Sequence, residues 1–329
     1  MVSLTGQLIR KALYTFSNIN PERVESAIPG CAGLDIFKMR NPNREMKYYD
    51  GKTKNGTKYE VYLPKDKSKV HPDNCVYYLH GGAYIGKQNW IYRYQSRYYS
   101  AAAGGATVVY VDYDVAPAAV YPTQLDQAYD VWNEITGKLG FKAENVVCGG
   151  DSAGGNLTLG LMLKLRDEGR DMPRGAFCMS PWADMLGQGD SYIDNYNVDI
   201  MFGNKKGELT PEKKQQLMDF DVYCWTKGAD RADPYVSPVY GDYHGFPPMF
   251  FTVGCDEMLR SDTETIAKNL RKNGVPVEVF RGNGMWHVFT LFHGIIPEAT
   301  AAFSCLTNFI SDRFETYDYT YPGKKYRIS

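Results

Sequence analysis

The stretch Val146-Val147-Cys148-Gly149-Gly150-Asp151-Ser152-Ala153-Gly154-Gly155 decides the fold of this chain. An apolar, β-branched run comes first, and residues 157–165 after it follow a helical pattern. Ser152 stands between glycines at the junction, where a side chain on either flank would collide with neighbouring backbone. The turn exposes the hydroxyl and aims the N-terminus of the next helix at it, which favours negative charge there. Ser152 is therefore a candidate nucleophile, although Gly-x-Ser-x-Gly alone also suits a plain tight turn.

Strand-like and helix-like segments alternate on both sides of this turn. Short apolar runs separated by helical patterns occur at residues 75–79, 107–111, 176–179, 249–253 and 275–280. Such alternation predicts an α/β fold, with a mostly parallel central sheet covered by helices on both faces. Two further β-like runs, at 46–49 and 59–63, flank Asn55-Gly56 and predict a hairpin that precedes the alternation.

Three segments depart from this pattern. Residues 3–18 have the spacing of an amphipathic helix. Residues 186–232 are polar and lack β-like runs, which predicts an insertion above the sheet. Residues 315–329 contain four tyrosines and a Pro-Gly pair, and we expect an irregular surface tail there.

Composition excludes several classes of protein. The 329 residues include 37 Lys and Arg against 38 Asp and Glu, so the chain is neither a strongly basic nucleic-acid binder nor a disordered acidic tail. No run of 18 apolar residues occurs, so we expect no membrane span. The seven scattered cysteines form no Cys-x-x-Cys pair, so we expect no metal and no cofactor, and a reducing, cytoplasmic location.

A second motif, His80-Gly81-Gly82-Ala83-Tyr84, follows the strand-like run 75–79 directly. Small residues at this place let backbone N–H groups converge on one point, as an oxyanion hole requires. The segment from Gly81 to Lys87 also fits the pattern of a phosphate-binding loop. That loop needs Ser or Thr next, and the residue present is Gln88, which disfavours this alternative.

A serine nucleophile needs a base, and the base needs an orienting acid. Of the five histidines, His287 lies in a glycine-rich loop after a predicted strand. Asp256 follows the run 249–253 in the same way, at an edge where the catalytic groups of open α/β sheets gather. Glu257 and Asp262 are close by, but at the start of or inside the next helix, where acids complement the helix dipole. The order Ser152, Asp256, His287 is the order found in α/β-hydrolases.

Together these motifs resemble the hormone-sensitive-lipase-like carboxylesterases of the α/β-hydrolase superfamily, over roughly residues 74–310. The resemblance rests on eight stretches, at 80–83, 112–117, 121–122, 150–156, 180–184, 247–248, 254–256 and 284–289. It implies an α/β-hydrolase fold with a helical cap: residues 45–185 and 233–329 would form the catalytic domain, and residues 1–44 and 186–232 the cap.

The resemblance also implies a role for each site residue. Ser152 would be the nucleophile, His287 the general base and acid, and Asp256 the orienting carboxylate. The backbone N–H groups of Gly82, Ala83 and Ala153 would form the oxyanion hole. Ala83 replaces the third glycine usual in the family, which adds a methyl group to the substrate pocket.

The sequence thus predicts a serine carboxylic-ester hydrolase, acting on small, short-acyl esters through an acyl-enzyme. We expect Tyr84, Trp182 and Trp286 to wall the substrate pocket, and the resemblance implies that the chain can form a homodimer. Two alternatives remain open. One is a peptidase or amidase that uses the same triad, and the other is a non-catalytic ligand receptor on a hydrolase scaffold. Such receptors tend to lack the histidine, which is present here as His287.

Overall fold

The computed structural model describes residues 2–16, 44–219 and 221–316 of the chain. Its eight strands form one sheet in the order β1-β2-β4-β3-β5-β6-β7-β8. The strands are β1 (Met46–Lys52), β2 (Lys58–Pro64), β3 (Cys75–Leu79), β4 (Thr107–Asp112), β5 (Val146–Asp151), β6 (Gly175–Met179), β7 (Met249–Gly254) and β8 (Val277–Gly282). Strand β2 pairs antiparallel with β1 and with β4, and every other pairing is parallel. The predicted hairpin and mostly parallel sheet are confirmed.

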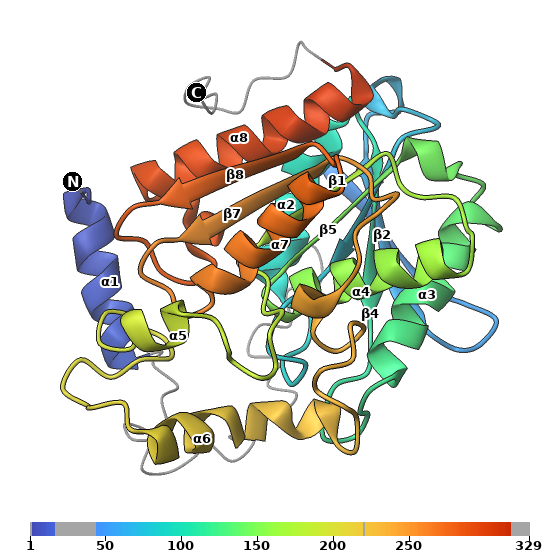
Figure 1. Cartoon of the computed structure of the whole chain (residues 1–329). Helices are drawn as coiled ribbons and strands as arrows, with labels where there is room; N and C mark the ends of the chain where they lie inside the picture. The colour runs from blue at the N-terminus through green and yellow to red at the C-terminus, as the bar shows by residue number, and fades with distance from the viewer. Residues whose placement is uncertain (1, 17–43, 220, 317–329) are drawn as a thin grey trace.

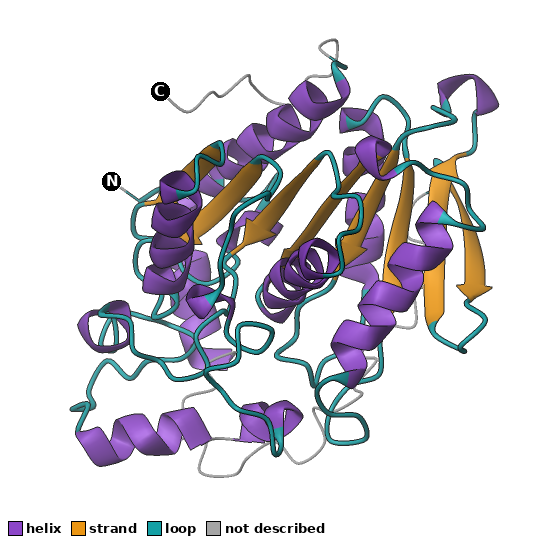
Figure 2. Cartoon of the chain, turned by 45° about the vertical axis from the view of Figure 1, so that its right-hand side comes forward, coloured by secondary structure: helices purple, strands orange, loops and turns teal. Residues whose placement is uncertain are grey.

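Helices cover both faces of the sheet, as Figure 2 shows. Helices α2 (Trp90–Ala102) and α8 (Pro297–Phe314) pack together on one face. Helices α3 (Thr123–Thr136), α4 (Ala153–Asp167) and α7 (Arg260–Lys272) cover the other face, each within one large apolar cluster. Strands β3, β5, β6 and β7 are buried along their whole length, which explains their continuous apolar sequences.

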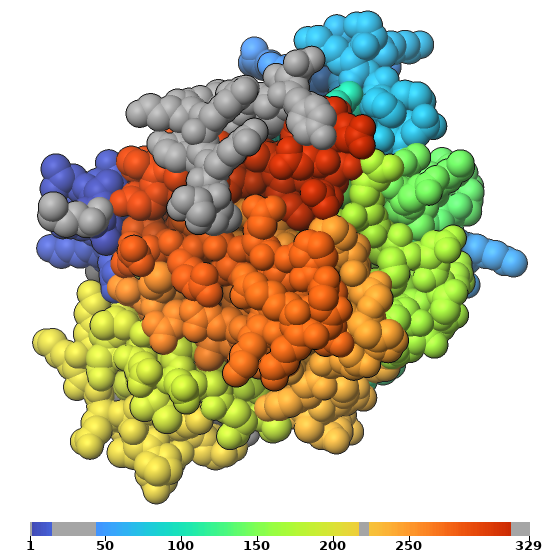
Figure 3. Space-filling view, turned by 45° about the horizontal axis from the view of Figure 1, so that its top comes forward, coloured from blue at the N-terminus to red at the C-terminus, as the bar shows by residue number. Residues whose placement is uncertain are grey.

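Helix α1 (Leu4–Phe16) confirms the predicted amphipathic helix. It lies beyond the ends of β7 and β8, on the same side as the short helix α5 (Ser191–Asp194) and helix α6 (Pro211–Asp219) (Figure 1). The space-filling view in Figure 3 shows α1 at the surface beside the start of α8. There the Ser3 amide and hydroxyl donate to the two carboxylate oxygens of Glu298, over 2.6 and 2.8 Å. The predicted insertion at 186–232 contains no strand among its described residues.

Two further predictions concern a membrane span and the redox state of the cysteines. No helix in the described residues is long and apolar enough to cross a membrane. Six of the seven cysteines lie in described parts of the chain, and none of these six forms a disulfide bond. Most of the tyrosine-rich tail, residues 317–329, lies outside the described residues.

Candidate active site

Ser152 occupies a sharp turn between β5 and α4. Its backbone has φ 52° and ψ −121°, a strained conformation for a residue with a side chain. A Cβ atom on Gly150 would lie 2.3 Å from the Gly154 carbonyl oxygen, and one on Gly154 would lie 2.0 Å from the Leu79 carbonyl oxygen. Only glycine fits at either position, so the predicted reason for these two glycines is confirmed.

His287 lies beside the serine, although 135 residues separate the two in the sequence. Its Nε2 atom is 2.9 Å from Ser152 Oγ, and its side chain is almost fully buried. The loop after β8 delivers the ring, and the left-handed backbone of Val288 ends that loop before a short 3₁₀ helix, Phe289–Phe292. Phe202, from the insertion, packs edge-on against the imidazole with ring centroids 4.9 Å apart. Ser152 and His287 are therefore brought together as the sequence predicts.

The carboxylate at the other side of the imidazole is Glu257, and the prediction of Asp256 is wrong. His287 Nδ1 lies 2.8 Å from Glu257 Oε2, and the Glu257 side chain is fully buried. Its second oxygen accepts the Gly254 amide over 3.0 Å. Asp256 instead pairs with Arg10 at 2.5 Å. Helix α7 begins only at Arg260, so Glu257 belongs to the turn after β7, where its side chain points inward and that of Asp256 points away.

The insertion holds this acid-bearing turn in place. The Asn195 side-chain amide donates to the carbonyl oxygens of Cys255 and Glu257, over 2.9 and 2.7 Å. The Asp199 carboxylate accepts a hydrogen bond from the Met258 amide over 2.7 Å. Burial raises the pKa of the Asp199 carboxyl. The sequence gives no signal for Asn195 or Asp199, because both reach the turn from about 60 residues away.

The loop after β3 has the form of an oxyanion loop. Gly82, Ala83 and Tyr84 all have positive φ, at 113°, 53° and 60°. The Gly86 amide closes the turn on the Gly82 carbonyl over 2.7 Å. Among the described residues, the amides of Gly82, Ala83 and Ala153 have no hydrogen-bond acceptor. Ala153 is the first residue of α4, so its N–H is one of the unpaired amides of a helix N-terminus.

Aromatic side chains gather next to this loop. The Tyr84 ring stacks on Trp225 with centroids 4.0 Å apart, and its hydroxyl donates to Asn156 Oδ1 over 2.7 Å. Trp182 meets Trp225 edge-on at 6.3 Å, and its amide donates to the Ser152 carbonyl oxygen over 3.1 Å. The structure brings Tyr84 and Trp182 together and adds Trp225, which the sequence did not indicate.

Trp286 does not join this aromatic group. Its ring lies 5.7 Å from that of Phe292, in a separate apolar cluster between α1 and α8. The side chain is 1% exposed. Although it neighbours His287 in sequence, its ring packs into the core on another side of the loop, so the prediction that Trp286 helps wall the substrate pocket is not supported.

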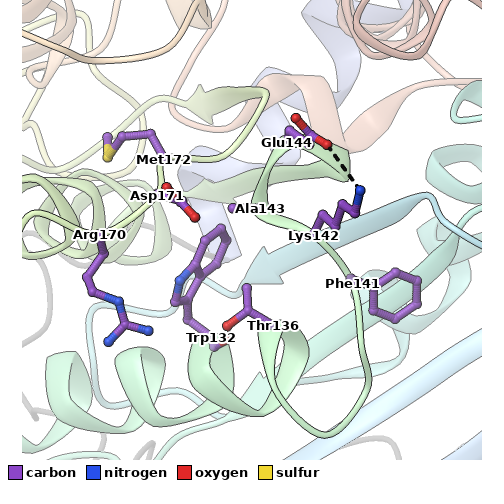
Figure 4. Close-up of a pocket in the computed structure, with 9 residues that line it drawn as sticks. All are labelled: Trp132, Thr136, Phe141, Lys142, Ala143, Glu144, Arg170, Asp171 and Met172. Carbon is purple, nitrogen blue, oxygen red and sulfur yellow. Dashed lines mark hydrogen bonds and ion pairs between the residues drawn. The ribbon is translucent and has the colours of Figure 1, made fainter.

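A separate cavity of about 580 Å³ lies near the start of β5, at the end of the strand opposite to Ser152 (Figure 4). Its lining includes Trp132, Phe141, Lys142, Glu144 and Arg170, and none of the predicted site residues. Among the described residues, no group of three or more His, Cys, Asp or Glu side chains could hold a metal ion.

Comparison with known proteins agrees with this geometry. A family model described as the alpha/beta hydrolase fold matches residues 76–291, and the chain belongs to that family. The chain is 30% identical over 244 residues to an esterase of Acinetobacter venetianus, which covers 74% of this chain and 76% of that protein. It is 32% identical over 229 residues to the putative acetyl-hydrolase LipR of Mycobacterium tuberculosis, with 70% of each chain covered.

A solved structure supports the same family membership. A hormone-sensitive lipase from a metagenome library superposes with a TM-score of 0.76 at 25% identity, covering 93% of this chain and 98% of that one. The predicted fold, the hormone-sensitive-lipase-like family and the class of carboxylic ester hydrolases are confirmed.

Proposed function

We propose that Ser152, His287 and Glu257 are the catalytic triad of a serine ester hydrolase. One observation carries the proposal: an unbroken chain runs from Ser152 Oγ to His287 Nε2 at 2.9 Å, and from Nδ1 to Glu257 at 2.8 Å. A carboxylate at Nδ1 holds the ring proton there, which leaves the Nε2 lone pair facing the serine hydroxyl. Nε2 can then accept the hydroxyl proton as Oγ attacks.

Acyl transfer proceeds in two halves on these groups. Ser152 Oγ attacks the ester carbonyl, and His287 takes the serine proton. The amides of Gly82, Ala83 and Ala153 stabilise the oxyanion, helped by the positive end of α4. His287 gives the proton to the leaving alcohol. Water then attacks the acyl-enzyme with the same proton transfers in the same order, releasing the acid and restoring Ser152.

The aromatic group supports a small, short-acyl ester as substrate. Tyr84, Trp182 and Trp225 form one aromatic group, the Trp182 amide donates to the Ser152 carbonyl oxygen, and Ala83 adds a methyl group to the oxyanion loop. Rigid rings at stacking distance leave little room for a long acyl chain. Within this proposal residues 45–185 and 233–329 form the catalytic domain, and residues 1–44 and 186–232 form the cap; Phe202 of the insertion packs on the imidazole.

The decisive experiment compares the wild type with Ser152→Ala. The wild type should hydrolyse p-nitrophenyl acetate and react covalently with a fluorophosphonate probe, with the adduct on the Ser152 peptide. Ser152→Ala should lose both properties and keep the wild-type circular dichroism and melting temperature. Ser68→Ala, at an exposed serine outside the site, is the matched control and should keep both properties. Hydrolysis or labelling that survives in Ser152→Ala would overturn the proposal, and a labelled wild type that cleaves amides but no esters would favour an amidase.

Two broader points belong to the same proposal. Six described cysteines without a disulfide bond are typical of a reducing compartment, which supports the cytoplasm; localisation of a tagged full-length chain tests this. The homodimer expected from the family stays a prediction, and sedimentation velocity of the purified protein tests it.

A further inference from the structure

Arg10, on helix α1, binds three separate segments around the proposed triad. Its Nη1 atom donates to Asp256 Oδ2 over 2.5 Å and to the Gly284 carbonyl oxygen over 2.8 Å. Its Nη2 atom donates to the Val198 carbonyl oxygen over 2.9 Å. One guanidinium therefore joins the turn after β7, the loop after β8 and the insertion.

These three partners are next to groups that set the triad geometry. Asp256 precedes Glu257 directly, and Gly284 is three residues before His287. Because both accept from the same nitrogen, Arg10 fixes the spacing between the acid-bearing turn and the histidine loop. Val198 precedes Asp199, whose carboxylate holds the Met258 amide on the far side of Glu257.

Helix α1 is itself held firmly enough to place this side chain. Ser3 anchors its first turn to Glu298 of α8. A Cβ atom on Gly284 would lie 2.3 Å from Val2 Cγ2, so the N-terminal segment lies directly against the histidine loop. Ile9 and Leu13, on the same side of the helix, pack into the apolar cluster that contains Met285 and Trp286.

We propose that Arg10 is a positioning residue, which lets helix α1 hold the Glu257–His287 half of the triad in its reactive geometry. The inference rests on the proposed triad. The side chains of Arg10 and Asp256 keep 20% and 26% of their exposure, and a partly exposed ion pair contributes little to folding stability. Two guanidinium nitrogens in one plane reach three acceptors on three segments, a rigid branched geometry that an ammonium group does not provide. The role of Arg10 is therefore geometric more than stabilising.

The test compares Arg10→Ala, Arg10→Lys and the control Gln7→Ala. Gln7 lies on the same helix, and its exposed side chain donates to the backbone carbonyl oxygen of Val2, just before the helix, without reaching the triad loops. Turnover of p-nitrophenyl acetate is measured per active site, counted by the endpoint of fluorophosphonate labelling. Small misplacements of catalytic groups cost up to about 10²-fold in rate, so we expect kcat of Arg10→Ala to fall by about tenfold. KM should stay within about twofold, because no contact to substrate is removed.

Further readouts separate positioning from a general structural role. The rate constant of fluorophosphonate labelling should fall by the same factor as kcat in Arg10→Ala. Arg10→Lys should recover part of both rates, and Gln7→Ala should match the wild type. In an Asp256→Asn background, Arg10→Ala should cost less than in the wild type, because one of the contacts is already weakened. If Arg10→Ala fails to fold, Arg10→Lys is judged by the same rates.

Unchanged kcat and labelling rate in the folded variants would overturn the proposal. So would a raised KM at unchanged kcat, since α1 would then act on substrate binding. Either result is distinguishable from failure of the triad assignment, which would appear as an unlabelled, inactive wild type.

Discussion

The Gly81 amide donates a hydrogen bond to Asp151 Oδ1 over 2.9 Å, so the residue before the proposed nucleophile holds the first glycine of the oxyanion loop. The same carboxylate accepts the hydroxyl groups of Tyr78 and Tyr92, over 2.8 and 3.0 Å. Burial raises the pKa of Asp151, and these three donors offset part of that effect. The end of β5 and the loop after β3 are thereby fixed to one buried side chain.

Replacing Asp151 with Asn should therefore impair both the loop and the fold. An amide has one acceptor oxygen, so at least one of the three donors loses its bond, and an unpaired buried donor costs about 1–3 kcal/mol. We expect Asp151→Asn to lower the free energy of unfolding by about that amount, and kcat by about 10–10²-fold, comparable to weakening one oxyanion donor. Urea unfolding and p-nitrophenyl acetate turnover measure the two effects. Asp167→Asn, at a more exposed carboxylate on α4, is the control; a fully active Asp151→Asn enzyme would contradict the role of this carboxylate.

The two neighbouring acids after β7 should differ strongly in their effect on turnover. Glu257→Gln keeps the shape of the side chain but no longer fixes the reactive tautomer of His287, and we expect kcat to fall by about 10²–10⁴-fold. Asp256→Asn keeps an acceptor for Arg10 and should stay within about fivefold of the wild type. The measurement is kcat for p-nitrophenyl acetate at pH 8 with both variants shown to be folded. A severe loss in Asp256→Asn with a mild one in Glu257→Gln would restore the sequence-based assignment.

This pair of residues shows where sequence patterns succeed and where they stop. The strand-to-helix turn at Ser152 and the glycine-rich loop of His287 are local signals, and each places its residue correctly. Whether residue 256 or 257 faces the imidazole depends on how the turn after β7 folds under the insertion, which no local pattern contains. The sequence pattern set Glu257 aside as an acid at the start of the next helix, but helix α7 begins only at Arg260, so Glu257 is free to turn toward the imidazole.

Residues contributed from a distance were not predictable in the same way. Arg10 reaches Asp256 across 246 positions, and Trp225 reaches Tyr84 from a segment without helical or strand periodicity. Their side chains are ordinary in their own sequence context, and only the packing of the insertion and α1 against the sheet edge gives them neighbours in the site. The same holds for Trp286, whose sequence position beside His287 says nothing about which side of the loop its ring packs on.

The aromatic group should set the preferred acyl length. We expect the wild type to have its highest kcat/KM for p-nitrophenyl acetate or butyrate and little activity on the decanoate. Trp225→Ala removes the ring stacked on Tyr84 and should shift the optimum toward longer acyl chains, raising the decanoate-to-acetate ratio of kcat/KM by about tenfold, the scale of a few buried methylenes. Trp286→Ala, in the separate cluster, is the control and should lower stability without changing that ratio. A wild-type optimum at decanoate would refute the narrow pocket.

Two buried histidines predict how stability depends on pH. Burial lowers the pKa of His80 and of His293 to about 4, from 6.5 in the unfolded chain. Between those values the unfolded chain binds more protons, so the free energy of unfolding falls as the pH falls. The stabilisation is fully present above pH 6.5 and is lost as the pH drops to about 4, at up to about 3 kcal/mol per histidine.

His293 allows this to be tested away from the proposed active site. Its ring stacks on Phe303 with centroids 3.8 Å apart, so His293→Phe keeps an aromatic contact and removes one titrating group. The free energy of unfolding from urea titrations at pH 7.5, 6.0 and 5.0 should fall less steeply in His293→Phe than in the wild type. The difference between the two proteins should grow by about 1.4 kcal/mol per pH unit below pH 6. Buried carboxylates with raised pKa values, such as Asp262, change stability in the opposite direction, but they are the same in both proteins and cancel in the difference. Above pH 7.5 the two curves should run parallel, because the imidazole is then neutral in both the folded and the unfolded chain. Equal slopes between pH 7.5 and 5.0 would mean that His293 is protonated in the folded protein and that its burial does not disfavour the charge.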